Sequence, residues 1–154
     1  MHSIDKKIEE LKLNLPLMPN PIANYLPYKI ENNILYISGQ GPILDGKLLY
    51  SGKVGVDISV DDGIKASEIC CLNIISIIKF ATSNNWDNFK CFIKIGGFVN
   101  CASNFKDQPK IINGASDLLV KIFGENGKHS RFAVGANALP INMSVEIEAM
   151  VALK

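Results

Sequence analysis

The feature that most constrains the fold is a strict alternation of side chains near the C-terminus. From residue 142 to residue 153 every second side chain is apolar, which predicts a β-strand, because successive side chains of a strand point to opposite faces of its sheet. The apolar face must be covered by helices, and the mixed face then meets either solvent or another subunit. The apolar face carries Met143, Val145, Ile147, Ala149, Val151 and Leu153, and the other carries Ser144, Glu146, Glu148, Met150 and Ala152.

Helices are predicted in three places. A long apolar helix runs from Val60 to Ser83, and a second runs from Pro109 to Phe123, where two glycines follow. Residues 3–13 have helical spacing and Ser3 at the capping position, so residues 1–14 form an N-terminal helix. Residues 15–27 contain four prolines and are predicted to form an extended arm.

The remaining strands fall between these helices. Residues 28–37 read as two short strands hinged at Asn32-Asn33, and a further short strand follows Asp45-Gly46. Residues 89–100 form a long strand in which Gly96-Gly97 predicts a bulge or bend, and residues 130–136 form another. The order predicts a single α+β domain over 1–154, a two-layer sandwich with two helices on one face of a mixed sheet.

Composition disfavours several classes of protein. A net charge of +1 gives no basic surface for nucleic acid, and no apolar run is long enough to cross a bilayer. The charged N-terminus is unlike a signal peptide, so we expect a cytoplasmic protein whose four cysteines are reduced. The chain has only two histidines, which argues against a histidine metal site, and we expect no metal.

Arg131 is the only arginine, among sixteen basic residues. A guanidinium binds a carboxylate through two parallel hydrogen bonds, which lysine cannot copy. Arg131 is therefore a candidate anion clamp. The alternative is an ion pair with Glu146 or Glu148.

Several motifs in order resemble the RidA/YjgF family of imine and enamine deaminases, once labelled endoribonuclease L-PSP. They are SGQGP after a hairpin, GFVNCASNFKDQPKIINGASDLLVKIFGENGKHSR, VGANALP and VEIEA. The resemblance runs from about residue 15 onward and is greatest to the longer branch of the family. It implies a chorismate mutase-like fold assembled as a homotrimer, with a central β-barrel and ligand clefts between subunits.

The resemblance also implies a reaction that needs no cofactor. A 2-imino acid would bind through its carboxylate to Arg131, and Glu146 with a backbone carbonyl near Ala133 would hold the attacking water. Ammonia would leave, and a 2-keto acid would remain. Tyr25, Gly39 and Asn113 would line the cleft, with Tyr25 and Arg131 meeting across a subunit boundary.

The sequence departs from the family pattern beside the arginine. Phe132 replaces a serine and Ala133 replaces a cysteine, although strand alternation predicts that Phe132 points away from Arg131. The stretch LDGKLLYSGKVG adds length near the cleft. A trimer that binds a keto acid without catalysis is therefore an alternative. RNA cleavage, suggested by the older family label, is disfavoured by the charge.

Overall fold

The computed structural model describes residues 1–18 and 24–154, and its elements follow the predicted order. The helices are α1 (Ser3–Glu10), α2 (Val60–Ala81) and α3 (Gln108–Phe123). The strands are β1 (Tyr28–Glu31), β2 (Ile34–Gln40), β3 (Ile43–Leu44), β4 (Lys47–Leu48), β5 (Phe89–Asn100), β6 (Ser130–Ala136) and β7 (Val145–Leu153). Part of the predicted arm, residues 19–23, lies outside the described residues. No helix in the described ranges is long and apolar enough to cross a membrane.

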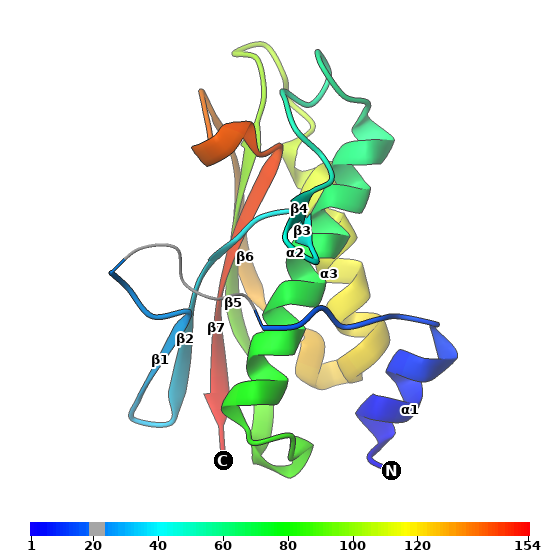
Figure 1. Ribbon diagram of the computed structural model, residues 1–154, viewed down its shortest axis with the longest axis vertical. Coiled ribbons are helices and arrows are strands. Elements are labelled where there is room, and N and C mark those ends of the chain that lie inside the picture. The colour runs from blue at the N-terminus through cyan, green and yellow to red at the C-terminus, as the bar shows by residue number, and fades with distance from the viewer. Residues whose placement is uncertain (19–23) are drawn as a thin grey trace.

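The five long strands form one mixed sheet in the order β1-β2-β7-β5-β6, while β3 and β4 form a separate hairpin. Strands β5 and β6 pair in parallel, with α3 as the crossover between them, whereas β1–β2, β2–β7 and β5–β7 pair in antiparallel fashion. Figure 1 shows α2 and α3 side by side against one face of the sheet, with α1 beyond them. The predicted α+β architecture is therefore confirmed.

The core lies between the sheet and the two long helices. Alternate residues of β7 from Val145 to Val151 are almost fully buried, as the period predicted. The helices approach closely at Gly114, where a Cβ atom would lie 2.5 Å from the carbonyl oxygen of Ile64. Glycine allows this contact because it has no side chain. Among the described residues no helix covers the opposite sheet face, and Tyr36, Phe98 and Val134 are exposed there.

The short helix α1 is fixed to the end of α2 by one carboxylate. Asp5 Oδ1 accepts hydrogen bonds from Lys79 Nζ at 2.9 Å and Trp86 Nε1 at 3.0 Å. Burial alone would raise the pKa of Asp5, but these two bonds and the charge of Lys79 outweigh it and lower the pKa below 3.8. The ionised form of Asp5 therefore stabilises this end of the fold.

Several predicted boundaries were wrong. The N-terminal helix ends at Glu10, and His2 rather than Ser3 caps it, because His2 Nδ1 accepts from the amide of Ile4 at 3.1 Å. The last strand begins at Val145 instead of 142, since Ile141 and Asn142 have φ values of 51° and 59°. Helix α2 ends at Ala81, two residues early, because φ is also positive at Ser83.

The predicted bulge at Gly96-Gly97 was also wrong. Both glycines pair in regular register with β7, and the shifts in β5 lie nearer its start, between residues 89 and 94. The glycines leave room for large neighbours on the two faces. A Cβ at Gly97 would lie 2.5 Å from Cδ1 of Ile112, and one at Gly96 would lie 2.5 Å from Cε1 of Phe132.

Candidate functional site

The side chain of Arg131 lies on the helix side of the sheet, at its β6 edge. Its partner in the register is Ile95 of β5, which is fully buried beneath the helices. The guanidinium donates from Nη1 to Ser116 Oγ at 3.0 Å and from Nη2 to the carbonyl oxygen of Pro109 at 3.3 Å. Both acceptors belong to α3, so the crossover helix holds the arginine.

Within one chain, the alternative of an ion pair between Arg131 and Glu146 or Glu148 was wrong. Over residues 1–18 and 24–154, no carboxylate oxygen lies within 4.0 Å of the guanidinium. A guanidinium carries five N–H donors, and the two bonds to α3 use two of them. Three donors remain, enough to bind a carboxylate through two hydrogen bonds.

The residues after Arg131 alternate between the two faces. Ala133 lies on the helix side with Arg131, opposite Gly97 of β5. Phe132 lies on the open face, where its ring packs edge-on against Phe98 with centroids 5.3 Å apart. The prediction that Phe132 points away from Arg131 is therefore confirmed, and the departure from the family pattern at this position does not crowd the guanidinium.

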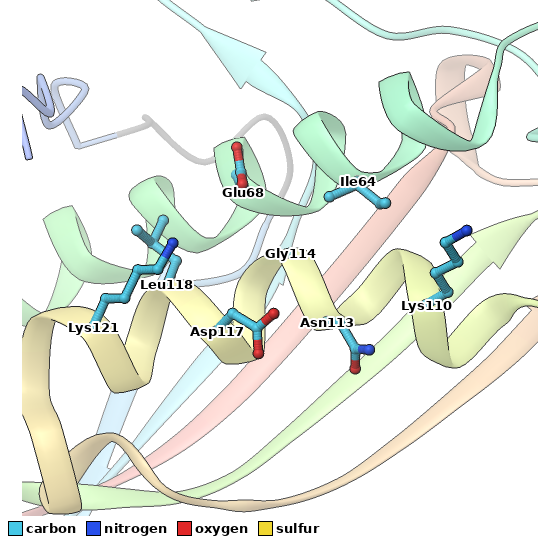
Figure 2. Close-up of a pocket in the computed structure, with 8 residues that line it drawn as sticks. All are labelled: Ile64, Glu68, Lys110, Asn113, Gly114, Asp117, Leu118 and Lys121. Atoms are coloured by element: carbon cyan, nitrogen blue, oxygen red, sulfur yellow. The ribbon is translucent and has the colours of Figure 1, made fainter.

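Asn113 is exposed on α3, between the two acceptors that hold Arg131. Positions 109, 113 and 116 follow helical spacing and share one face of the helix. Asn113 also lines a hollow of about 260 Å³ between α2 and α3, and Figure 2 shows its side chain pointing away from α2. The hollow is lined by Ile64, Glu68, Lys110, Asn113, Gly114, Asp117, Leu118 and Lys121.

Glu146 lies on the open face of the sheet, on the central strand β7. Its register partner is Phe98, and its carboxyl group packs against Gly39 of β2, where a Cβ would lie 2.9 Å from Cδ of Glu146. The absence of a side chain at Gly39 is what makes room for the carboxylate. Burial raises the pKa of Glu146 above 4.5, and the nearby charge of Glu148 raises it further.

Tyr25 lies on the side of the sheet edge formed by β1 and β2, just before β1. Its side chain is 53% exposed. The next two residues bind β2, since Ser38 Oγ donates to the Leu26 carbonyl at 2.8 Å and the Ser38 amide donates to the Pro27 carbonyl at 3.0 Å. Tyr25 is thereby tethered close to the strand end that carries Gly39.

One chain therefore holds two separate groups of candidate residues. Arg131, Ala133 and Asn113 lie at the β6 edge on the helix side. Glu146 and Gly39 lie on the opposite face, with Tyr25 toward the β1 edge. The sheet separates the Arg131 guanidinium from the Glu146 carboxylate.

The added segment near the cleft forms the β3–β4 hairpin, with Asp45-Gly46 at its turn as predicted. The hairpin and the start of the arm enclose a mostly apolar hollow of about 600 Å³, which includes Gln40 and Asn73. The hollow adjoins Gly39 but contains neither Glu146 nor Arg131. Within the described ranges, no cluster of three or more His, Cys, Asp or Glu side chains is placed to hold a metal ion.

Sequence reasoning missed Ser116 and His129. Ser116 Oγ contacts His129 Nε2 at 2.9 Å as well as Arg131. The available signal was that one of only two histidines lies two residues before the only arginine. Strand periodicity places positions 129 and 131 on the same face.

Comparisons with known proteins agree on one family. The model of the family described as "YjgF/chorismate mutase-like, putative endoribonuclease" matches residues 6–152. Protein TCP17 of Trypanosoma cruzi is 35% identical over 147 residues, which cover 95% of this chain and 91% of that protein.

Solved structures give the same result. Protein Atu1372 of Agrobacterium tumefaciens, described as of unknown function, is 40% identical with a TM-score of 0.92, covering 99% of this chain and 93% of that one. A protein of Shewanella oneidensis described as a putative endoribonuclease is 34% identical with a TM-score of 0.94, covering 99% and 100%.

Proposed function

The chain belongs to the YjgF/chorismate mutase-like family, and we propose that it hydrolyses reactive 2-imino acids and their enamine tautomers to 2-keto acids and ammonia, without a cofactor. The observation that carries this proposal is the hydrogen bonding of the Arg131 guanidinium. Its guanidinium is held by two hydrogen bonds to α3, has no carboxylate partner among the described residues, and keeps three donors for a ligand. Such a group suits a small substrate with a carboxylate.

We propose that the complete site forms between copies of the chain in a homotrimer. Each chain presents a clamp at one sheet edge and an acid on the open face, and neither group can serve the other within one chain. The open face also carries Tyr36, Phe98 and Val134, which are exposed in the single chain. Packing three such faces around a central barrel would bury these side chains and bring Arg131 of one copy to Tyr25, Gly39 and Glu146 of another.

In the proposed reaction Arg131 binds the substrate carboxylate and thereby fixes the imine carbon. Water, held by Glu146 and the backbone carbonyl of Ala133, forms a bond to that carbon, and its proton passes to the glutamate. The glutamate delivers that proton to nitrogen, which gives a carbinolamine. The carbinolamine hydroxyl then gives up its proton, which reaches nitrogen by way of the glutamate as the C=O bond forms and the C–N bond breaks. Ammonia leaves, and the 2-keto acid is the product. A carboxylate with a raised pKa suits this exchange, because a higher pKa makes it a stronger base toward the attacking water.

The test compares steady-state hydrolysis of 2-iminobutyrate by the wild type and Arg131→Ala. Loss of a charged hydrogen-bonding partner costs about 1.5–3 kcal/mol, so kcat/KM should fall about tenfold or more. Lys128→Ala is the matched control, since it removes a cation three residues away whose partner is the exposed Glu125. Equal rates in wild type and Arg131→Ala would refute the role given to Arg131.

The second candidate function is binding of a 2-keto acid without turnover. The separation of clamp and acid within one chain favours it, because the clamp by itself holds an anion but activates no water. Glu146→Gln distinguishes the two functions. If the protein is an enzyme, this variant loses hydrolysis and still gains thermal stability from 2-ketobutyrate. If it is a binding protein, neither wild type nor variant hydrolyses 2-iminobutyrate and both are stabilised by 2-ketobutyrate.

A further inference from the structure

A chain of hydrogen bonds extends from Arg131 into the body of the protein. Arg131 Nη1 contacts Ser116 Oγ at 3.0 Å, Ser116 Oγ contacts His129 Nε2 at 2.9 Å, and His129 Nδ1 contacts the carbonyl oxygen of Gly127 at 2.7 Å. This series of hydrogen bonds joins β6, α3 and the turn that precedes β6. It ends at a backbone atom, the carbonyl oxygen of Gly127.

The chemistry of the end groups, taken with a neutral His129 ring, gives each bond one direction. A carbonyl oxygen only accepts, so His129 Nδ1 carries a proton and donates it to Gly127. In the neutral ring Nε2 is then the acceptor, and the Ser116 hydroxyl donates to it. A guanidinium only donates, so Ser116 Oγ must accept from Arg131. Each group has one consistent role, and successive bonds polarise and strengthen one another.

The fold fixes the anchor at Gly127. A Cβ on this residue would lie 2.7 Å from the carbonyl carbon of Leu119, so only glycine lets the turn lie this close to α3. The close approach puts the Gly127 carbonyl and the His129 ring beside Ser116. Phe92 contacts the ring from another direction, with centroids 6.4 Å apart at 62°. The imidazole is therefore held by packing as well as by its two hydrogen bonds.

We propose that His129 and Ser116 are positioning residues for Arg131, and that they hold its guanidinium ready for a carboxylate before the ligand arrives. This inference rests on the proposed function for the meaning of the clamp, although not for its test. An arginine side chain has several rotatable bonds, and ordering it on binding weakens affinity. The chain of hydrogen bonds imposes that order in the free protein, so loss of His129 should weaken binding of the carboxylate through Arg131.

The single arginine makes a direct test possible. Labelling the protein with ¹⁵N-arginine gives side-chain NMR signals from Arg131 alone. In the wild type, at a temperature just above the freezing point of water, the hydrogen bonds to Ser116 and Pro109 should slow rotation about the Nε–Cζ bond of the guanidinium. The two Nη atoms should then give separate signals. Ser116→Ala and His129→Phe should merge these signals into a broad average. His129→Phe keeps an aromatic ring against Phe92, and Ser116→Ala suits a helix, so both are expected to fold.

Two variants serve as controls. Ser116→Thr keeps the hydroxyl and should retain the separate signals. His2→Ala removes the only other histidine, which caps α1, and should leave the Arg131 signals as in the wild type. Backbone amide spectra of each variant establish that the fold is intact. Separate Nη signals in a folded His129→Phe variant would overturn the proposal, and so would their loss in Ser116→Thr.

Ligand binding supplies the functional measurement. The Kd for 2-ketobutyrate, or KM for 2-iminobutyrate, should rise about two- to tenfold in Ser116→Ala and His129→Phe, with little change in kcat. In the background of Arg131→Ala the same substitutions should have no further effect, because they act through the arginine. An additive loss in that background would overturn the proposal. If the wild type fails to hydrolyse 2-iminobutyrate, the proposed enzymatic function fails, while the NMR comparison still decides the role of His129.

Discussion

Gly39→Ala tests whether the position of the Glu146 carboxylate matters for catalysis. The new methyl carbon would lie 2.9 Å from Cδ and 3.1 Å from Cγ of Glu146, whereas ordinary contacts begin at 3.4 Å. The carboxyl carbon must therefore move by about 0.5 Å, and the nearer oxygen Oε1 must move farther. A misplacement of about 1 Å costs on the order of 100-fold in rate, so we expect kcat to fall between about tenfold and 100-fold.

The assay is steady-state hydrolysis of 2-iminobutyrate, with kcat and KM determined separately. The fold should survive, because the atoms that must give way are the end of a flexible side chain. Gly46→Ala is the control. A methyl there meets nothing within 4 Å, so the strain at its φ of +77° should lower stability without lowering kcat. An unchanged kcat in Gly39→Ala, with or without a higher KM, would refute the reasoning about Glu146.

Three further predictions concern stability. Glu146→Gln should raise the melting temperature at pH 7 but not at pH 4. A folded-state pKa raised above 4.5 means that stability falls as pH rises through that range, so equal shifts at both pH values would contradict the assignment. Asp5→Asn should lower the free energy of unfolding by about 1–2 kcal/mol at pH 7, in urea titrations, through its bond to Lys79. Asp5 has a lowered pKa in the folded state, so its stabilising effect is lost as pH falls and the carboxylate becomes protonated. The difference in unfolding free energy between wild type and Asp5→Asn should therefore shrink toward pH 3. Gly114→Ala should cost about 1–3 kcal/mol, since the methyl would meet the rigid backbone of Ile64, and a neutral result would contradict the close helix approach.

The architecture was predictable because burial imposes a period on the sequence. The alternation in β7 and the broad apolar face of α2 identify both layers without any knowledge of the partner segments. Element ends were less predictable, because they depend on single backbone angles such as the positive φ at Ile141. The role of Gly96 was misread for a related reason. Gly96 is glycine because the Phe132 side chain of the neighbouring strand occupies the space of its Cβ. The sequence around Gly96 does not distinguish this reason from a bulge.

The candidate site was predictable only as a set of residues. The rarity of arginine and the family motifs pointed to Arg131 and Glu146, but nothing local shows that they occupy opposite faces of the sheet. That separation follows from the strand order and register, which are long-range properties. The support of Arg131 by Ser116 was hidden for the same reason. Fifteen residues separate the two positions, and only the crossover through α3 brings them together.

The position of β7 in the sheet affects how the protein is made. The last strand of the chain lies at the centre of the sheet, between β2 and β5 (Figure 1). During synthesis both neighbours emerge from the ribosome before β7 exists, and their facing edges stay unpaired until β7 has emerged. The sheet can close only after that point. We therefore expect nascent chains that stall before β7 to expose strand edges that are prone to aggregation.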